Sequence, residues 1–259
     1  MVDLRQSPAY AKYITSLGWV VENGIFIRKL GIFGAIAKIQ RTAIPPNWRE
    51  IIKKHHVWMT KWEPEKNFNL QFTVFKQDSW PLLATKTLQI DLTPSSEKIL
   101  AGFKKDARYC LRKISNNQYS IINNDFDGFY KLWKKSAGIK KLWTPPLKDF
   151  QSLVSSFGKS CFCITIDNLA GALILIHDQT AYYYYAGALP EGKKKNLQYL
   201  VVWKCMLEAK KRGCKFWDFE GIYDPRWPNK DWKGFSHFKK SFGGTEIDFP
   251  GSFTKWGWW

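Results

Sequence analysis

The fold class is decided by one stretch, CFCITIDNLAGALILIHDQTAYYYYAG, which spans residues 161–187. It holds three apolar runs, Cys161–Ile166, Leu169–Ile176 and Ala181–Gly187, separated by short polar turns. Short apolar runs that are bounded by turn residues and rich in β-branched and aromatic side chains are typical of buried strands. The stretch therefore predicts three consecutive strands joined by tight turns.

The segments on either side of this stretch predict alternating helices and strands. In the helical segments, apolar residues recur three and four positions apart, and glycines such as Gly158 and Gly213 follow their ends. The predicted elements are a strand at 119–122, helices at 125–138 and 144–157, the three strands, a helix at 196–212, a strand at 215–219, a helix at 232–242 and a strand at 245–249. This order, β-α-α-β-β-β-α-β-α-β, is that of the GNAT acyltransferase fold, a mixed sheet that splays after its fourth strand. We therefore predict the fold class α/β (α+β), with a GNAT-like mixed sheet.

The N-terminal part predicts a short helix at Ser7–Ser16 followed by strands. Asn23–Gly24 between two apolar runs is a strong hairpin signal, and Thr93–Pro94 is a typical helix start. Further predicted strands lie at 35–40, 57–62, 70–75 and 85–92. We predict two domains and a connection between them: residues 1–92 as a short, incomplete GNAT-like first domain, residues 93–118 as a basic bridging helix, and residues 119–259 as a complete GNAT-like second domain.

The composition indicates a folded, basic protein. Hydrophobic residues make up 45% and charged residues 24% of the chain, which is ordinary for a globular protein. The 40 Lys and Arg residues outnumber the 22 Asp and Glu residues, so the net charge is +18. Such an excess attracts polyanions: nucleic acid, nucleotide phosphates or an anionic membrane face. We find no signal-peptide pattern and no apolar stretch of the roughly 18–20 residues that a membrane helix needs, so we expect a soluble, cytoplasmic protein.

The five cysteines do not form a metal-binding pattern. No CxxC pair is present, and Cys161 and Cys163 lie two apart in a strand-like run without a nearby histidine. We therefore expect reduced, mostly buried thiols and no metal site.

Two clusters of basic residues are candidates for contact with phosphates. They comprise Lys104, Lys105, Arg108 and Arg112 in the bridging helix, and Lys193, Lys194 and Lys195 at the start of the helix at 196–212. An ordinary solvated helix face mixes in acidic residues, but only Asp106 interrupts the first cluster. We interpret both clusters as anion-binding, with a plain solvated surface as the alternative.

The turn before the helix at 196–212 lacks the signature for CoA. GNAT enzymes hold the CoA pyrophosphate on main-chain N–H groups of a turn of the type Q/R-x-x-G-x-G/A. Here the segment Pro190–Asn196 holds one glycine and three lysines. We therefore expect no CoA cofactor.

The C-terminal part carries a series of more specific motifs. The segment FWDFEGI at Phe216–Ile222 is followed, after a loop rich in Trp and Pro, by Gly234–Phe235 and then by FKKSFGG at Phe238–Gly244. The segment YYYAG at Tyr183–Gly187 resembles a Y-x-Y-A-G strand, and Lys61–Pro64 gives a looser match in the first domain. Together these segments resemble the Fem (FemABX) family of aminoacyl-tRNA-dependent peptidyltransferases, which add amino acids to peptidoglycan precursors. The resemblance covers nearly the whole chain.

The resemblance implies an activity and partners. Members of the family move an aminoacyl group from tRNA to an amine on the precursor's stem peptide, without metal or cofactor and with aminoacyl-tRNA as co-substrate. The implied partners are aminoacyl-tRNA and a nucleotide- or lipid-linked peptidoglycan precursor. We expect a cytoplasmic monomer that can make peripheral contact with the inner face of the cell membrane.

The resemblance also implies catalytic roles. Lys239 is placed to stabilise the oxyanion of the tetrahedral intermediate, and Tyr185 to line the site. Asp218 and Glu220 sit at the end of a predicted parallel strand, where open α/β sheets place their sites, so either is a candidate to accept the amine's proton. Of the two, Asp218 matches the family motif and Glu220 does not. The alternatives are that Lys239 lies on the surface of an amphipathic helix and that Tyr185 belongs to the core.

Substrate-binding roles follow in the same way. Tyr183, expected on the same strand face as Tyr185, and Phe238 match residues that line the site. Lys12 matches a lysine that holds the precursor's diphosphate, and Glu63 matches an acidic residue of the first domain. Ordinary structural roles remain the alternative for Lys12 and Glu63.

The chain departs from the family at one phosphate-binding position. Some members carry Arg-Pro before the second helix of this domain and a Tyr four residues after that Arg, whereas the corresponding residues here are Pro145 and Asp149. Lys140, Lys141 or Lys148 can substitute as point charges, without the bidentate fork of arginine. The precursor specificity is therefore less defined than the use of tRNA.

The C-terminal segment FTKWGWW, residues 253–259, combines three tryptophans with a lysine. This composition suits a membrane interface, and the alternative is that the segment closes over the sheet.

Two other functions stay open: a CoA-dependent GNAT N-acyltransferase and a non-catalytic tRNA- or RNA-binding protein.

Overall fold

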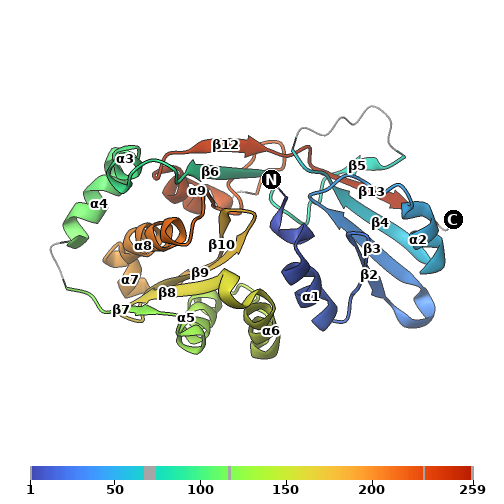
Figure 1. The fold of residues 1–259 in the computed structure, drawn as a ribbon, viewed down its shortest axis with the longest axis horizontal. Coiled ribbons are helices and arrows are strands. Elements are labelled where there is room, and N and C mark those ends of the chain that lie inside the picture. Colours follow the sequence, from blue (N-terminus) through green and yellow to red (C-terminus); the bar gives the residue numbers. More distant parts are fainter. Residues whose placement is uncertain (1, 67–73, 116–117, 230, 258–259) are drawn as a thin grey trace.

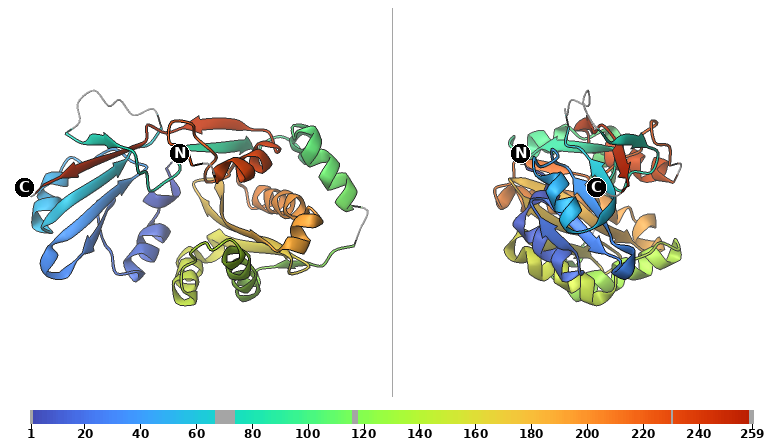
Figure 2. Two further views of the ribbon diagram at one scale, coloured as in Figure 1. Left: turned by 180° about the vertical axis from the view of Figure 1, so that it is seen from behind. Right: turned by 90° about the vertical axis from the view of Figure 1, so that its right-hand side faces the viewer.

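The computed structural model describes residues 2–66, 74–115, 118–229 and 231–257, whose strands form two sheets side by side (Figure 1). The predicted strand at 70–75 lies largely outside the described residues. Each sheet with its helices forms one lobe, called the first and the second lobe. Figure 2 shows the two lobes from behind and from one end. Among the described residues, no helix is long and apolar enough to cross a membrane.

The first sheet is formed mainly by the N-terminal part of the chain. In spatial order, its strands are β1 (Val20–Glu22), β2 (Ile25–Lys29), β3 (Ala35–Gln40), β4 (Val57–Glu63), β13 (Ser252–Trp256) and β5 (Lys76–Asp78). Its helical elements are η1 (Leu4–Gln6), α1 (Pro8–Ser16), η2 (Gly31–Phe33) and α2 (Trp48–Lys54). Asn23 and Gly24 both have positive φ and form the predicted two-residue turn between β1 and β2.

The second sheet contains residues 161–187, for which three consecutive strands were predicted. In spatial order, its strands are β12 (Thr245–Asp248), β6 (Lys86–Asp91), β11 (Phe216–Asp218), β10 (Thr180–Ala188), β9 (Ala170–His177), β8 (Cys161–Ile166) and β7 (Ile121–Asn123). The remaining helices are α3 (Ser96–Ala101), α4 (Lys105–Ser115), α5 (Phe126–Ile139), α6 (Leu147–Phe157), η3 (Gly158–Ser160), α7 (Pro190–Lys194), α8 (Leu197–Lys211) and α9 (Trp232–Lys240). The predicted fold class, a GNAT-like mixed sheet, is confirmed.

The second sheet opens where it was expected to. β10 pairs with the parallel strand β11 along Thr180–Tyr182, whereas the antiparallel strand β9 follows β10 as far as Ala188. β10 and β11 therefore part beyond Tyr182, and the segment after β11 lies at the opening.

The predicted domain boundaries do not follow the sheets. β6, within residues 1–92, pairs with β11 and β12 of the second sheet. β13, within residues 119–259, pairs with β4 and β5 of the first sheet. Each sheet is therefore completed by a strand from the other end of the chain, and the predicted "complete" second domain of 119–259 is wrong in this respect.

The predicted bridging helix is two helices, α3 and α4. Between them Phe103 is buried, edge-on to Phe242 at a centroid distance of 5.1 Å. The N–H of Lys104 donates to the carbonyl of Ser241 at 2.8 Å. Because Phe103 turns into the core and Gly102 is a poor helix former, the helix breaks although the apolar spacing continues.

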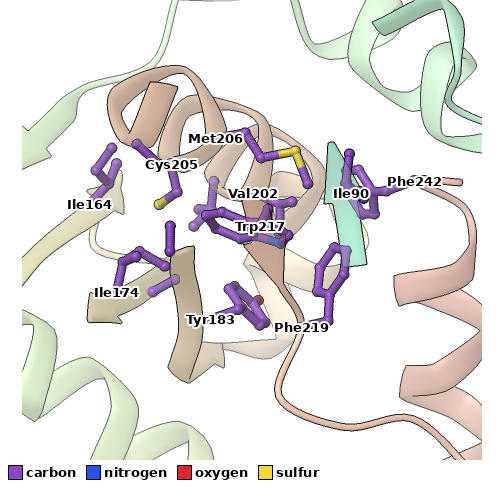
Figure 3. Packing of buried hydrophobic residues seen from close by; sticks show 14 of the residues in the cluster. Ile90, Ile164, Ile174, Tyr183, Val202, Cys205, Met206, Trp217, Phe219 and Phe242 are labelled. Carbon is purple, nitrogen blue, oxygen red and sulfur yellow. The ribbon is translucent and has the colours of Figure 1, made fainter. Parts of the chain in front are cut away.

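The two faces of the second sheet have separate cores. On one face, α8 and α9 pack over a cluster that includes Tyr183, Trp217 and Phe219 (Figure 3). On the other face, α5 and α6 pack over Leu173 and Leu175 of β9, and α1 of the first lobe joins them. The first sheet has its own core. The site described below therefore lies in a sheet that is covered on both faces.

The described part of the C-terminal segment is a strand of the first sheet. β13 lies between β4 and β5, and Phe253 is buried beside Trp62 at a centroid distance of 5.7 Å. Trp256 is exposed and contacts Trp58. Trp258 and Trp259 lie outside the described residues, so the role predicted for them at a membrane stays a prediction.

Candidate functional site

α9 directs Lys239 into the opened end of the second sheet. Its Nζ donates hydrogen bonds to the main-chain carbonyls of Phe219, at 2.7 Å, and Gly221, at 2.6 Å. The same atom lies 4.8 Å from the ring centroid of Phe235 and 5.9 Å from that of Tyr183. These contacts exclude an ordinary surface lysine.

The surroundings of Lys239 shift its titration towards neutral pH. Burial lowers its pKa to about 8, while the charges of Glu220 and Asp218 act in the opposite direction. An ammonium group has three N–H donors, and the described carbonyls of Phe219 and Gly221 use two of them. Within the described part of the chain these are its hydrogen bonds, which leaves one donor for a ligand.

Asp218, the last residue of β11, is buried and held by three donors. Its Oδ1 accepts from the Thr87 hydroxyl at 2.5 Å and from the Glu220 N–H at 2.7 Å, and its Oδ2 accepts from the Gln89 amide at 2.9 Å. Burial and the charge of Glu220 raise the pKa of Asp218 to about 6, against the lowering effect of the hydrogen bonds. A carboxyl group that titrates near neutral pH is suited to take up a proton.

Glu220 is held by an arginine that the sequence analysis missed. The Arg5 guanidinium, buried in η1, donates to both carboxylate oxygens of Glu220, with 3.1 Å between Nη1 and Oε1, and also contacts Asp3. Burial opposes the charged form of Arg5, but the charges of Glu220 and Asp3 prevail and hold its pKa well above the ordinary value. Glu220 has a φ of 59°, a left-handed conformation that is uncommon for a non-glycine residue. The ion pair with Arg5 and the hydrogen bond from the Glu220 N–H to Asp218 both hold Glu220 in place.

Tyr183 and Tyr185 lie on opposite faces of the sheet, so the expectation of a shared face is wrong. The pairing of β10 with β9 shifts between Tyr183 and Tyr185, which is a β-bulge at Tyr184. Tyr183 belongs to the core under α8 and α9, and Tyr185 packs against the core under α5 and α6. Tyr183, not Tyr185, is therefore the neighbour of Lys239.

The residues predicted to line the site with Lys239 have structural contacts. The Tyr183 hydroxyl accepts from the Gln198 amide at 2.6 Å, and Figure 3 shows its ring beside Phe219. Phe238 packs edge-on against Tyr199 at 4.9 Å. The aromatic rings therefore support the helix that carries Lys239.

Tyr185 lies instead at the junction of α1 with α5. Its ring stacks on Trp133 at a centroid distance of 4.0 Å, and it is hydrogen-bonded to Tyr13 of α1. Lys12, the neighbour of Tyr13 in α1, is exposed. Tyr185 and Lys12 thus lie near the seam between the lobes, on the other face of the sheet from Lys239.

Glu63, at the end of β4, positions a connecting loop. Its Oε1 accepts from the N–H groups of Leu82 and Leu83, both at 2.7 Å, and its Oε2 accepts from the Gln40 amide at 2.8 Å. Glu63 is buried. Its described contacts shape the segment that joins β5 to β6.

The two basic clusters are surface features of α4 and of the α7 region. Lys104, Lys105 and Arg112 are exposed, and exposed Arg108 donates to the carbonyls of Ala101 and Phe103 at the end of α3. Lys193 and Lys194 are exposed, and Lys195 forms a surface ion pair with Glu191 at 2.7 Å. Both clusters flank α8, at the end of the second lobe away from the first sheet (Figure 1).

A small cavity of about 70 Å³ reaches Asp218. It is lined by Asp3, Arg41, Glu65, Lys66, Gln89, Tyr182, Asp218, Ile247 and Phe249. Asp218 therefore has free space beside it in spite of its burial.

A larger cavity of about 1000 Å³ adjoins Gly221, the residue whose carbonyl binds Lys239. It lies between the segment 77–85 on one side and residues 222–229 with Trp232 on the other, and three tryptophans line it, Trp80, Trp227 and Trp232. A Cβ atom at Gly221 would come within 2.6 Å of Ala84 and 3.1 Å of Trp232, so this glycine lets the cavity wall approach the site. The size is that of a ligand pocket. The sequence analysis missed this cavity, although the Trp/Pro-rich loop was visible.

The turn where GNAT enzymes hold CoA is built differently here. α7 occupies it, and Gly192 is buried so closely against Leu169 that a Cβ atom would lie 2.5 Å from the Leu169 carbonyl oxygen. The single glycine therefore serves packing. As for metals, the described residues contain no group of three or more His, Cys, Asp or Glu side chains able to hold an ion.

The opened mixed sheet and its polar end place the chain in the class of GNAT-like proteins. Residues 165–256 match the FemAB family. A crystal structure of FemX is similar with a TM-score of 0.79 and 14% identity, over 97% of this chain and 92% of that one. The family match thus covers the C-terminal part of the chain, and the likeness to FemX, at 14% identity, shows a shared fold along nearly its whole length.

Two further solved structures share the fold. The C-terminal domain of a putative lysylphosphatidylglycerol synthetase from Agrobacterium fabrum has a TM-score of 0.63 and 12% identity, over 97% of this chain and 88% of that one. The L-PGS structure from Bacillus licheniformis has a TM-score of 0.58 and 8% identity, over 90% and 80%. No curated protein matches the chain.

Proposed function

We propose that this protein transfers an aminoacyl group from aminoacyl-tRNA to an amine of a peptidoglycan precursor's stem peptide. The observation that carries the proposal is the inward-directed ammonium of Lys239, with one N–H donor left for a ligand at the opened end of the second sheet. With a pKa of about 8, this group is mainly protonated at neutral pH and can stabilise a developing oxyanion.

The proposed step uses the activated ester of the donor. The acceptor amine attacks the ester carbonyl, a C–N bond forms, and the oxyanion accepts a hydrogen bond from Lys239. The C–O bond to the terminal ribose then breaks, and the ribose oxygen leaves as a hydroxyl after it receives the proton that Asp218 has taken from the amine. Asp218 takes up the proton that the amine loses, because its pKa of about 6 leaves it ionised at neutral pH, whereas Glu220 is committed to Arg5. Positioning and oxyanion stabilisation are the protein's main contributions.

The substrates are assigned to different surfaces. The exposed lysines and arginines of α4 and of the α7 region bind the tRNA phosphates, and the tryptophan-lined cavity beside Gly221 gives room for the reacting end of a substrate. Lys12, near the seam between the lobes, binds the phosphates of the acceptor. Because aminoacyl-tRNA is made in the cytoplasm, the protein acts there.

The alternative of a CoA-dependent N-acyltransferase is disfavoured by the packing of Gly192. A phosphate cradle needs free main-chain N–H groups and space, whereas Gly192 is pressed against Leu169. Acetyl-CoA should therefore leave the melting temperature unchanged, although a ligand that binds the native state raises it.

The experiment that tests the function is incubation with radiolabelled aminoacyl-tRNAs and a panel of nucleotide-linked and lipid-linked precursors. We expect the label in a precursor whose mass has increased by one aminoacyl residue. If every combination leaves the label on tRNA while tRNA still binds, the protein is a non-catalytic tRNA-binding protein.

A further inference from the structure

The connection between α5 and α6 exposes four apolar side chains to solvent. Trp143 is 80% exposed, Leu142 60%, Ile139 54% and Leu147 42%. Scattered apolar residues on a surface are normal, but four exposed apolar side chains within nine positions of the chain, with a tryptophan among them, indicate an interaction site.

The main chain of this connection is held in place. The Leu142 N–H donates to the Ala137 carbonyl at 3.0 Å, which closes the end of α5. Pro145 is buried, and its carbonyl accepts from the Tyr130 hydroxyl at 3.0 Å. The main chain is thus hydrogen-bonded on both sides of Trp143, and it holds the exposed apolar side chains in an ordered position.

The same part of the chain is strongly basic. Residues 131–148 contain six lysines and no acidic residue. All six are exposed: Lys131, Lys134, Lys135, Lys140, Lys141 and Lys148. Lys193 of α7 lies close enough for the charge of Lys140 to help burial lower the Lys193 pKa. The surface therefore combines one sign of charge with an exposed apolar group.

We propose that the connection 139–147 docks on a lipid bilayer that contains anionic headgroups, with Leu142 and Trp143 inserted at the interface. Tryptophan is favoured at the boundary between headgroups and acyl chains, and lysines next to it are attracted by anionic lipids. Peripheral binding of this kind uses both contributions together. A polyanion such as RNA would match the lysines but would leave Ile139 and Leu142 in water.

The docking surface adjoins the seam between the lobes. α6 follows the connection and packs against α1, where the hydroxyls of Ser16 and Ser152 are in contact. A lipid-linked precursor held at the bilayer would therefore be delivered beside α1, which carries Lys12. This choice of a lipid-linked acceptor rests on the proposed function, whereas the membrane contact does not.

The test is co-sedimentation of the protein with vesicles of phosphatidylcholine alone and of phosphatidylcholine mixed with phosphatidylglycerol. We expect binding to the mixed vesicles that weakens with added salt, and little binding to phosphatidylcholine alone. Leu142→Ser with Trp143→Ser should lower the partition coefficient at least about tenfold, because two inserted apolar side chains are removed. Lys140→Glu with Lys141→Glu should lower it similarly at low salt.

The matched control is Ile32→Ser with Phe33→Ser in η2. These side chains are 95% and 72% exposed but belong to the first lobe. This variant should bind the mixed vesicles like the wild type, and all variants should keep the wild-type melting temperature. No vesicle binding, equal loss in the control, or loss of tRNA binding instead of vesicle binding in the Leu142/Trp143 variant would each overturn the assignment. Vesicle binding needs no aminoacyl-tRNA, so its failure is distinguishable from a failure of transfer.

Discussion

The end of β11 and the basic surface of α4 and α7 both carry positive charge, but the charge is held in different ways. At the end of β11, Lys239 and Arg5 are directed inward and bonded to carbonyls or carboxylates, and burial shifts the pKa of Lys239 to about 8. On α4 and α7 the lysines are exposed to water. A reaction step therefore depends on a single buried group such as Lys239, whereas the binding of a polyanion is shared among many exposed lysines. The predictions below separate these two behaviours.

The largest effect is expected at Lys239. Lys239→Met keeps the apolar stem and removes the charge, and the loss of one oxyanion donor costs about 100- to 1000-fold in rate. Single-turnover transfer from aminoacyl-tRNA measures it. Lys240→Met is the control, because Lys240 pairs with Glu246 at the surface and should keep most activity. Equal losses of rate in both variants would mean that Lys239 acts in tRNA binding and not in the chemical step.

The second effect concerns stability. Arg5→Met leaves the carboxylate of Glu220 without its partner in a largely buried place, and such a loss costs about 3 kcal/mol of the free energy of unfolding. Lys195→Met removes an exposed partner of Glu191 and should cost much less, because water and salt screen an exposed ion pair. Urea unfolding of both variants gives the comparison. Similar small losses would mean that the Arg5 pair does not hold Glu220.

The third effect is a bell-shaped pH profile. Transfer requires ionised Asp218, with a pKa of about 6, and protonated Lys239, with a pKa of about 8. Single-turnover rates should therefore be maximal between these values and fall about tenfold per pH unit on either side. Asp218→Asn should lower the rate and remove the fall on the acid side. An unchanged acid limb in this variant would assign the proton acceptor to another group.

The smallest effect is expected on the exposed surface. Lys104→Gln with Lys105→Gln should weaken tRNA binding by only a few-fold and reduce the slope of log affinity against log salt by about one per lost phosphate contact. Filter binding at several salt concentrations measures both. The control, Lys53→Gln with Lys76→Gln, removes two exposed lysines from the first lobe. If the salt dependence of binding changes only in this control, tRNA binds to the first lobe instead.

Local signals in the sequence predicted most of the second lobe. The apolar runs of residues 161–187 became β8, β9 and β10, and the Asn23–Gly24 pair became the hairpin turn. These elements depend on neighbours in the chain, so spacing and turn residues are sufficient to find them. The exchange of β6 and β13 between the sheets depends on pairing of strands from opposite ends of the chain, and no local pattern encodes it.

The site was predicted only in part for the same reason. Lys239 was found through the resemblance, and Asp218 and Glu220 through their place at the end of a predicted strand; the charges of both carboxylates act on Lys239. The run of four tyrosines, Tyr182–Tyr185, gave no signal of where a bulge would fall, so Tyr185 was placed on the wrong face. Arg5 was missed because its partner Glu220 is 215 residues away in the sequence.

A competition between acyl donors tests the central claim most directly. The protein and a stem-peptide precursor are given aminoacyl-tRNA with one radiolabel and acetyl-CoA with another, both at saturating concentration. The account predicts that only the label from tRNA appears on the precursor's amine, and that Lys239→Met slows its appearance. Transfer of the acetyl label, with none from tRNA, would contradict it.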